Sequence, residues 1–341
     1  MKFLITGIAG FIGSHLARSL LSKGHTIVGI DDFNDDIYNS SIKYNRLMDL
    51  LNLTNDDINT LRISDSIHEE NISIYKLNIA NQSRVEDIFS LYKGFDVVIN
   101  LAAYANPLLS LKNPNKYIES NIVGFFNILN SIKLFSQDSL FIYASTSSVY
   151  GLKDNQYIPS RLDDNTNKPI SLYAATKKCD ELLTFSYYKS FNVKSVGLRF
   201  FTVYGPFGRP DMALWKFTKS ILNDSPIELY NYGNNFRDFT YIDDLIKSIN
   251  CIIDGKSSLK SDYLVYNIGS QHPIKISDFV SLLEESLNKK AIKLYVPPKV
   301  GDTVYTFSDS TDLYNDFHYR PDTDIRNGIQ SFVDWYIRRK Y

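Results

Sequence analysis

The feature that most constrains the fold is the regular alternation of short apolar runs with helix-like segments over the first two hundred residues. Most of the apolar runs lack polar alternation, which is typical of parallel strands buried on both faces. The runs cover residues 2–6, 26–31, 73–78, 96–101, 140–145 and 194–200. Helical patterns lie between them at residues 11–22, 84–92, 115–131 and 173–190. Alternation of this kind predicts an α/β fold with a doubly wound parallel sheet.

Two parts of the chain depart from this rhythm. Residues 34–71 are rich in Asn, Asp and Ser, carry a helical stretch near 42–53, and are predicted to form a surface insertion. After Tyr204-Gly205-Pro206, helical patterns near 212–223, 245–253, 276–287 and 325–338 mix with short strands. We therefore expect a larger domain over residues 1–204 and a smaller α/β domain over 205–341, with some segments of the latter returning to the main sheet.

Composition excludes several classes of function. The 341 residues carry a formal net charge of −1, which argues against nucleic acid as a partner because phosphate binding needs a basic surface. A transmembrane helix needs about 18 consecutive apolar residues, and no run of that length is present. The glycines near the N-terminus argue against a signal peptide. Two cysteines, Cys179 and Cys251, are too few for a disulfide framework and favour a cytoplasmic setting. The five histidines lack metal-ligand spacing, so we expect no metal.

A glycine motif predicts a dinucleotide site. Gly7-Ile8-Ala9-Gly10-Phe11-Ile12-Gly13 follows the first strand and opens a helix, whose N-terminus favours a pyrophosphate. Asp31 ends the second strand, at the distance expected for an acid that accepts bonds from both adenosine ribose hydroxyls. Asp31 and Asp32 would repel a 2′-phosphate, and no arginine adjoins them, so the motif favours NAD over NADP in a Rossmann domain. A structural turn followed by a chance aspartate is the alternative.

A tyrosine and a lysine four residues apart indicate the chemistry. Tyr173 and Lys177 share one face of a predicted helix, where the ammonium would favour the phenolate. Thr146-Ser147-Ser148 follows a predicted strand at the edge where open α/β sheets bind ligands. Hydroxyl, phenol and ammonium groups beside a nicotinamide would form an apparatus for moving a proton and a hydride. The alternative for the Tyr–Lys pair alone is an exposed helix face.

At these residues the chain resembles the extended short-chain dehydrogenases/reductases, of the nucleotide-sugar epimerase and dehydratase kind. The resemblance runs nearly end to end and includes Leu101-Ala102-Ala103, the cluster before Val149-Tyr150-Gly151, and residues 237–244 (RDFTYIDD). Residues 171–178 (SLYAATKK) and 198–214 (LRFFTVYGPFGRPDMAL) look specifically like UDP-glucuronate 4-epimerases. The long second stretch is the most diagnostic.

The resemblance implies a role for individual residues. Tyr173 is the acid/base at the sugar 4-hydroxyl, Lys177 holds the nicotinamide ribose, and Thr146 hydrogen-bonds the same sugar oxygen. Cofactor contacts fall at Asn78, Ile79 and residues 101–103, and substrate contacts at Ser147, Ser148, Thr202, Arg209, Arg237, Lys299 and Asp302. Arg209 would meet the hexuronate carboxylate and Arg237 the diphosphate. The alternatives are a surface loop charge for Arg209, an ion pair with Asp238 for Arg237, and a turn-forming role for Asn78.

The chain also departs from the family pattern. Where uronate epimerases usually read Ala-Ala-Gln-Ala-Gly-Val-Arg-Tyr-Ser, this sequence has Ala102-Ala103-Tyr104-Ala105-Asn106-Pro107-Leu108-Leu109-Ser110. Gln is thus replaced by Tyr104 and Arg by Leu108, in a loop that borders the sugar pocket in the family. Asn78 stands in place of the usual Asp, and Lys299 stands where many relatives place an arginine.

The expected reaction is NAD-dependent 4-epimerisation of a UDP-hexuronate through a 4-keto sugar. A UDP-glucuronate decarboxylase and a 4-epimerase of a neutral UDP-sugar remain open, and a non-catalytic dinucleotide sensor is a further alternative. A 4,6-dehydratase is disfavoured, because that class usually has Thr-Asp-Glu where this chain has Thr146-Ser147-Ser148.

We expect a homodimer as well. The helices near 115–131 and from Tyr173 onward are apolar on more than one side, which is typical of deep burial or of an interface. The apolar positions are Ile118, Ile122, Val123, Phe125, Phe126, Ile128 and Leu129 in the first helix, and Leu182, Leu183, Phe185, Tyr187 and Tyr188 in the second. The alternative is that the insertion at 34–71 covers the second face.

Overall fold

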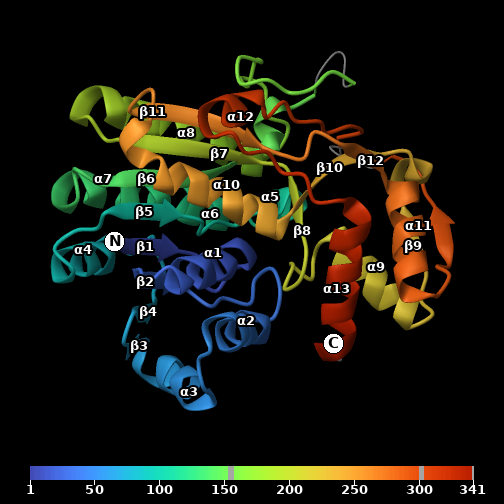
Figure 1. Ribbon diagram of the computed structural model, residues 1–341, viewed down its shortest axis with the longest axis horizontal. Coiled ribbons are helices and arrows are strands. Elements are labelled where there is room, and N and C mark those ends of the chain that lie inside the picture. The colour runs from blue at the N-terminus through green and yellow to red at the C-terminus, as the bar shows by residue number, and fades with distance from the viewer. Residues whose placement is uncertain (153–156, 299–302, 340–341) are drawn as a thin grey trace. The chain divides into compact units, whose positions relative to one another are not determined.

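The chain divides into two compact units. The computed structural model describes residues 1–152, 157–298 and 303–339 (Figure 1). The first unit comprises Met1–Val149, Pro169–Arg199 and Ile252–Tyr266, and the second comprises Tyr150–Lys168, Phe200–Cys251 and Asn267–Tyr341. The chain therefore crosses between the units several times. Residues 252–266 are a return of the late chain to the first unit.

The first unit is built on a mostly parallel sheet. Its strand order is β11-β7-β6-β5-β1-β2-β4-β3. The strands are β1 (Lys2–Thr6), β2 (Thr26–Asp31), β3 (Ser66–Glu69), β4 (Ile72–Lys76), β5 (Val97–Asn100), β6 (Leu140–Thr146), β7 (Ser195–Phe200) and β11 (Tyr263–Ile268). Strand β1 pairs in parallel with β2 and β5, β5 with β6, and β2 with β4, which confirms the doubly wound sheet. The sequence did not predict the antiparallel edge strand β3.

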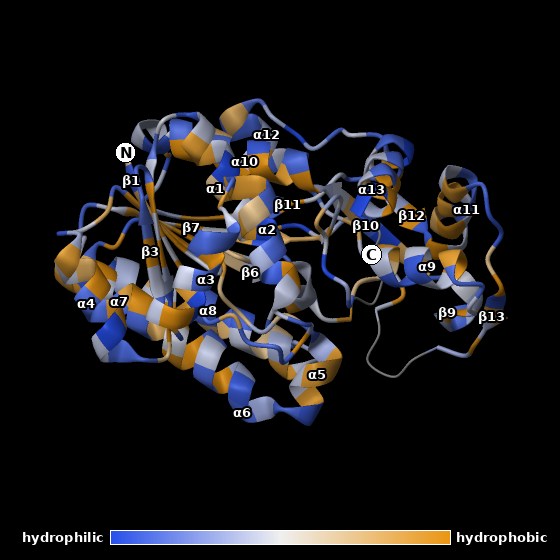
Figure 2. Ribbon diagram, turned by 90° about the horizontal axis from the view of Figure 1, so that it is seen from below, coloured by the Kyte–Doolittle hydropathy of each residue, from blue (hydrophilic) through white to orange (hydrophobic). Residues whose placement is uncertain are grey.

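Helices cover both faces of this sheet (Figure 2). Helix α1 (Phe11–Ser22) lies on one face, and α4 (Gln82–Leu91), α7 (Phe125–Phe135) and α8 (Leu172–Phe191) lie on the other. The apolar strands and these helices bury a continuous core that includes Leu4, Val98, Phe125, Ile128 and Phe141. Because side chains on both faces of the sheet are buried, the strand sequences are unbroken apolar runs. Among the described residues, no helix is long and apolar enough to cross a membrane.

The helix predicted at 115–131 is not one regular helix. After α5 (Pro107–Lys112), the chain forms α6 (Pro114–Tyr117), a π-helical stretch η1 (Ile118–Gly124) and then α7. A Cβ on Gly124 would lie 2.6 Å from a side-chain carbon of Ile79, so this stretch packs closely against the loop that follows β4. π-Helical turns are frequent at functional sites, and this one buries Asn121.

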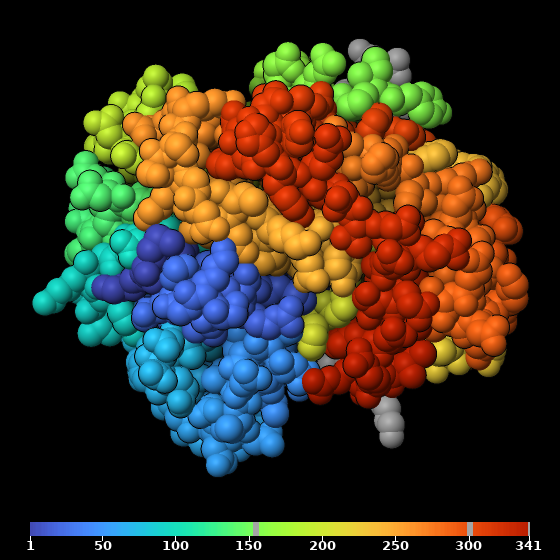
Figure 3. Space-filling view, viewed as in Figure 1, coloured from blue at the N-terminus to red at the C-terminus, as the bar shows by residue number. Residues whose placement is uncertain are grey.

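The insertion is only partly a surface element. It forms α2 (Ser41–Leu51), α3 (Asn55–Ser64) and β3, and α3 begins with a capping box between Thr54 and Asp57. The insertion forms a continuous surface below α1 in the space-filling view (Figure 3). Helix α2 nevertheless packs against α1 and buries Arg46 and Leu47 completely. The prediction of a surface insertion was therefore wrong for α2, whose apolar face completes the core.

The second unit contains two small sheets and several helices. Strand β10 (Phe236–Tyr241) pairs in parallel with β8 (Thr202–Tyr204) and antiparallel with β12 (Pro273–Lys275), and β9 (Ile227–Leu229) pairs with β13 (Lys293–Tyr295). The helices are α9 (Ala213–Leu222), α10 (Ile242–Asp254, which continues into the first unit), α11 (Ile276–Leu287), α12 (Thr311–Phe317) and α13 (Ile325–Arg339). Short helical turns are η2 (Ser147–Tyr150), η3 (Tyr230–Gly233) and η4 (Lys256–Ser258).

A buried ion pair fastens α8 to the sheet. Glu181 on α8 accepts two bonds of 2.9 Å from the guanidinium of Arg199 on β7, and a third of 2.7 Å from Ser145 on β6. Burial opposes the charge on Glu181, but the contacts with Arg199 hold the pKa of its carboxyl below the ordinary value. The pair thus fixes α8, which carries Tyr173 in its first turn, relative to the strand that ends at Thr146.

Replacing Arg199 with Met should destabilise the first unit strongly. The change leaves the Glu181 carboxylate buried without its main partner, which costs about 3–5 kcal/mol in the free energy of unfolding. Lys23→Met is the matched control, because it breaks an exposed ion pair with Asp254 that is worth about 0–1 kcal/mol. Urea denaturation followed by circular dichroism measures both, and similar midpoints for the two variants would contradict the expected role of the buried pair.

Candidate functional site

The glycine turn after β1 is held in place by close backbone packing. Gly7 has a φ of +71°, and a Cβ there would lie 2.8 Å from the backbone nitrogen of Ala102, just after β5. A Cβ on Gly13 would overlap the carbonyl oxygen of Gly7, and one on Gly10 would lie 2.9 Å from it. No side chain caps the first turn of α1 at Gly10. A tight turn with uncapped N–H groups at a helix start fits the pyrophosphate of a dinucleotide.

Asp31 lies directly beside this turn. Its carboxylate accepts the N–H of Ala9 at 3.2 Å, the N–H of Phe33 at 3.0 Å and the ammonium of Lys43 at 3.1 Å. An ionised carboxylate has about four acceptor positions, so the protein itself uses three of them. Asp31 therefore keeps acceptor capacity beyond these three contacts, and its bonds to the ribose hydroxyls stay a prediction.

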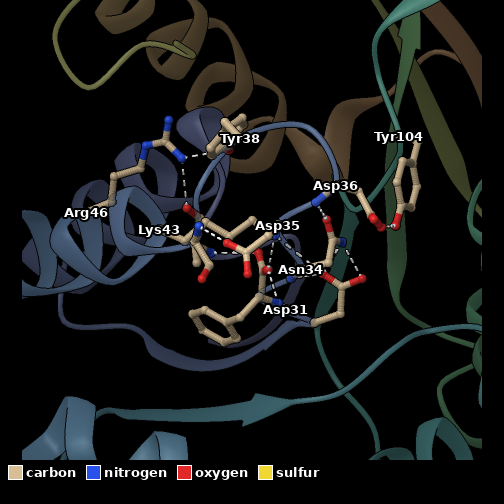
Figure 4. A network of polar contacts seen from close by, with 12 residues as sticks. Asp31, Asn34, Asp35, Asp36, Tyr38, Lys43, Arg46 and Tyr104 are labelled. Atoms are coloured by element: carbon tan, nitrogen blue, oxygen red, sulfur yellow. Dashed lines mark hydrogen bonds and ion pairs between the residues drawn. The ribbon is translucent and has the colours of Figure 1, made fainter. Parts of the chain in front are cut away.

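Two basic residues of α2 belong to the same network (Figure 4). Lys43 also lies 3.4 Å from Asp32, and Arg46 donates to the carbonyl oxygen of Ala9 at 3.2 Å and to the hydroxyl of Tyr38 at 2.9 Å. Burial opposes the charge of Lys43, but Asp31 and Asp32 raise its pKa above the ordinary lysine value. Neither residue was predicted from the sequence, because neither is an immediate neighbour of Asp31 in the chain. Their spacing of three on an amphipathic helix was the available signal.

The other expected cofactor residues differ in their surroundings. Asn78 is exposed, and its side-chain oxygen accepts the N–H of Ala80 at 2.9 Å, which is the turn-forming arrangement considered as the alternative. Ile79 is buried, and its carbonyl oxygen accepts a bond of 3.0 Å from Asn127 of α7. Residues 101–103 follow β5 directly, and the N–H of Ala102 donates to Thr6 at 3.1 Å. This loop and the glycine turn thus pack together at the carboxyl ends of adjacent strands.

Thr146 and Tyr173 occupy defined positions at the sheet edge. Thr146 is the last residue of β6, and its hydroxyl oxygen accepts the N–H of Ser148 at 3.2 Å. Ser147 and Ser148 continue into η2 and are partly buried. Tyr173 lies in the first turn of α8, which Ser171 caps by accepting the N–H of Ala174 at 3.1 Å. The Tyr173 ring packs edge-on against the buried ring of Tyr117, with centroids 6.5 Å apart.

Lys177 lies one turn after Tyr173 and is almost completely buried. Its ammonium contacts the carboxylate of Asp180 at 3.1 Å. Burial raises the pKa of Asp180 to about 7, although the attraction of Lys177 opposes this shift. Asp180 Oδ1 has no hydrogen-bond partner among the described residues. Asp180 was not predicted from the sequence as a site residue.

Asn121 joins the loop after β5 to the start of α8. Its side chain accepts the N–H of Tyr104 at 2.8 Å and donates to the carbonyl oxygen of Tyr104 at 3.0 Å. The same side chain donates to Thr176 at 3.0 Å, and Thr176 donates to the carbonyl oxygen of Tyr173 at 2.8 Å. The π-helical turn that aims Asn121 inward has no signal in the apolar periodicity, which explains why the sequence did not reveal it.

Three further residues expected to bind substrate, Thr202, Arg209 and Arg237, lie in the second unit. Thr202 on β8 pairs with Phe239 on β10, and Arg237 lies two residues before Phe239. The neighbouring Asp238 carboxylate accepts bonds from the Ser270 and Ser308 hydroxyls at 2.8 and 2.5 Å.

Arg209 donates to Asp211 through Nε at 2.9 Å and through a terminal nitrogen at 2.6 Å. Lys299 and Asp302 lie outside the described residues. Within residues 1–152, 157–298 and 303–339, no cluster of His, Cys, Asp or Glu is suited to hold a metal ion.

Comparisons with known proteins point to one family. Residues 3–269 match the model of the NAD dependent epimerase/dehydratase family. The chain is 43% identical to Protein CapI of Staphylococcus aureus, over 99% of this chain and 98% of that protein. It is 37% identical to UDP-glucuronate 4-epimerase 6 of Arabidopsis thaliana, over 99% of this chain and 72% of the plant protein. The structure of UDP-glucuronic acid 4-epimerase from Bacillus cereus, in complex with UDP-glucuronic acid and NAD, matches with a TM-score of 0.85, 32% identity and full coverage of both chains.

The Asp180 carboxyl should make stability depend on pH. Its pKa rises from 3.8 to about 7 on folding, so its proton stabilises the native state fully at low pH. This stabilisation is lost as the pH rises through about 7. Between about pH 5 and pH 8 the free energy of unfolding should therefore fall by roughly 1–3 kcal/mol more in the wild type than in Asp180→Asn. Urea titrations across this range test the slope, and Asp262→Asn, an exposed change in the same unit, should follow the wild type.

Proposed function

This chain belongs to the NAD dependent epimerase/dehydratase family, and from that premise we propose that it interconverts UDP-glucuronate and UDP-galacturonate by 4-epimerisation. The protein is an NAD-dependent nucleotide-sugar epimerase. The observation that carries the choice of a uronic acid is the geometry at Arg209, whose guanidinium already binds a carboxylate through two parallel N–H groups. A planar arginine fork suits a carboxylate and has little use for the neutral hydroxymethyl group of a hexose.

The cofactor site is proposed at the glycine turn, Asp31 and Lys43. When bound there, NAD would supply reversible hydride transfer to and from the sugar. The turn presents the N–H groups at the start of α1 to the pyrophosphate, and Asp31 accepts a ribose hydroxyl. Lys43 neutralises part of the charge of Asp31 and Asp32, and so lowers their repulsion of the phosphates.

Tyr173 is the proposed acid and base for the sugar 4-hydroxyl. The phenolate takes the hydroxyl proton during oxidation, and the phenol gives the proton back to the 4-keto oxygen during reduction. Thr146 donates to the same oxygen and holds it near the tyrosine. Lys177, four residues after Tyr173 on α8, is proposed to hold the nicotinamide ribose with its ammonium. The Glu181–Arg199 pair keeps α8 and β6 in register for this arrangement.

Arg209 has a second proposed task, which is to preserve the carboxyl group of the intermediate. A 4-keto uronate is a β-keto acid, and it loses carbon dioxide most easily when the breaking bond is perpendicular to the carbonyl plane. Two parallel hydrogen bonds from Arg209 hold the carboxylate in one orientation and keep it from that geometry. In this proposal the substrate carboxylate takes the place that Asp211 occupies beside Arg209.

Incubation with four nucleotide sugars tests the proposed function. UDP-glucuronate, UDP-galacturonate, UDP-glucose and UDP-N-acetylglucosamine are each supplied without added cofactor, and the products are identified by NMR. Interconversion of the first two sugars alone is expected. A UDP-pentose would indicate decarboxylation instead, UDP-galactose would indicate a neutral-sugar epimerase, and NAD binding without turnover would indicate a sensor.

Tyr173→Phe should lower kcat by about 10²–10⁴-fold, which is the usual contribution of a positioned acid or base. Bound NAD should be retained, because the glycine turn and Asp31 are unchanged. Tyr232→Phe, an exposed tyrosine of the second unit, is the matched control and should keep wild-type turnover. Steady-state kinetics with UDP-glucuronate measure both variants, and near-normal turnover by Tyr173→Phe would refute the assigned role.

We propose further that the protein is a homodimer paired through η1, α7 and α8. Apolar side chains on these helices remain exposed, so the insertion does not cover them. Val123 and Phe185 are each 44% exposed and Leu182 is 59% exposed, and Ile118 and Phe126 are also open to solvent. A contiguous apolar face on two adjacent helices suits a self-complementary, four-helix contact.

Light scattering at micromolar concentration should therefore give twice the chain mass. Leu182→Glu should shift the protein toward the monomer, because it places a charge in the centre of the apolar face. Ile63→Glu is the matched control, since Ile63 is 86% exposed on α3, away from that face. A fully active wild-type monomer would remove the dimer from the proposal.

A further inference from the structure

Tyr104 binds a part of the chain far from it in sequence. Its hydroxyl donates to one oxygen of the Asp36 carboxylate, and the ammonium of Lys116 contacts the other oxygen. Asp36 lies in the segment between β2 and α2, Tyr104 lies in the loop after β5, and Lys116 belongs to α6. Figure 4 shows Asp36 and Tyr104 reaching toward each other from separate stretches of ribbon, on the opposite side of the network from Lys43 and Arg46.

The strand order shows what this contact spans. In the sheet β1 lies between β5 and β2, so a bond between the segments after β5 and β2 crosses the end of β1. Two strand spacings amount to roughly 10 Å. The glycine turn and the start of α1 follow β1, which is where the proposed site receives the pyrophosphate.

We propose that Tyr104, Asp36 and Lys116 form a latch that holds the segment between β2 and α2 across the bound dinucleotide and slows its release. The inference rests on the proposed cofactor site. It makes Tyr104, one of the residues that depart from the family pattern, a positioning residue for the cofactor.

Charge explains why a latch is needed. Asp31, Asp32, Asp35 and Asp36 lie within six residues, and so many carboxylates would repel a diphosphate nearby. Lys43 compensates Asp31 and Asp32, and Asp35 accepts the N–H of Ser40 at 2.5 Å. Asp36 is compensated by Lys116 and Tyr104. Burial alone would raise the pKa of its carboxyl, but the bonds from Lys116 and Tyr104 bring that pKa below the ordinary value, so the carboxylate stays charged at neutral pH.

The Tyr104 end of the latch is firmly anchored. Asn121 binds both the N–H and the carbonyl oxygen of Tyr104, and it also binds Thr176 of α8. The Tyr104 ring contacts the Tyr117 ring, with centroids 5.5 Å apart, and Tyr117 in turn contacts Tyr173. The same residues, Asn121 and Tyr117, therefore contact both Tyr104 and the start of α8, where the proposed acid/base lies. The part of the latch that can open is the hydrogen bond from the Tyr104 hydroxyl to Asp36. Tyr104→Phe removes that hydroxyl and keeps the ring.

Isotope exchange of bound NAD tests the latch. The protein is loaded with labelled NAD, chased with an excess of unlabelled NAD, and desalted at intervals to count the label that remains. Tyr104→Phe should exchange about tenfold faster than the wild type, since it removes a hydrogen bond to a charged group. Lys116→Met should exchange about two- to fivefold faster, because its ion pair with Asp36 is partly exposed to solvent. Tyr92→Phe is the matched control, because it removes a hydroxyl that contacts Tyr75 elsewhere in the same unit, and it should exchange at the wild-type rate.

A double-mutant comparison isolates the bond itself. Asp36→Ala removes both latch contacts, so adding Tyr104→Phe to it should give no further acceleration. Full additivity would overturn the latch, because the two residues would then act separately.

The thermal midpoint of the NAD-free protein separates retention from stability. A latch predicts faster exchange with little change in that midpoint, whereas a lower midpoint with unchanged exchange would show a purely structural bond and overturn the proposal. A wild type that retains no NAD would overturn the proposed cofactor site, and the latch with it. Retained NAD that exchanges equally slowly in all variants would overturn the latch alone.

Discussion

The close packing of the glycine turn against the ends of neighbouring strands is the constraint on which the proposed site depends. The turn has no room for a Cβ at Gly7 or Gly13, because the backbone after β5 and the turn's own carbonyl oxygen occupy that space. Asp31 and Arg46 bind the two sides of Ala9 within the turn, one at its N–H and the other at its carbonyl oxygen. The start of α1 is thereby fixed relative to β2, β5 and α2 before any ligand binds. Such preorganisation lowers the entropy cost of ordering a dinucleotide.

Around this turn, charge is balanced by residues from several elements. The acidic segment after β2 is compensated by Lys43 from α2, which contacts Asp31 and Asp32, and by Lys116 from α6, which contacts Asp36. Beneath the proposed catalytic residues, α8 carries two adjacent buried acids with different partners. Glu181 binds Arg199 and fastens the helix to the sheet, whereas Asp180 binds Lys177, whose charge the proposed chemistry uses. One helix thus carries a structural ion pair and a second ion pair that includes a proposed catalytic residue.

The proposed reaction requires that the catalytic side chains are held rigidly at the end of the sheet and that other residues select the sugar. The contacts of α8, β6 and η1 meet the first requirement within the first unit. In the second unit, β8 and β10 place Thr202 and Arg237 on neighbouring strands, and the loop that follows β8 carries Arg209. The first unit therefore supplies the residues proposed for proton and cofactor chemistry. The second supplies those proposed to recognise the nucleotide sugar.

The sequence by itself determined the elements whose physics is local. Unbroken apolar runs and 3.6-residue periodicity located β1, β2, α1 and α11 with the observed bounds, and the confirmed doubly wound sheet follows from their alternation. The glycine motif and the Tyr173–Lys177 spacing are equally local, because a tight turn and one helical turn need only neighbouring residues.

Only the tertiary structure decided which distant side chains meet. Lys43 reaches Asp31, Asn121 binds Tyr104 through a π-helical turn, and Tyr104 reaches Asp36 across the end of β1. Asp36 and Tyr104 are separated by 68 residues, and their meeting depends on a strand order that places β1 between their segments. Long polar side chains carry no periodic signal of their partners. These side chains pair only because the sheet brings the carboxyl ends of its strands together.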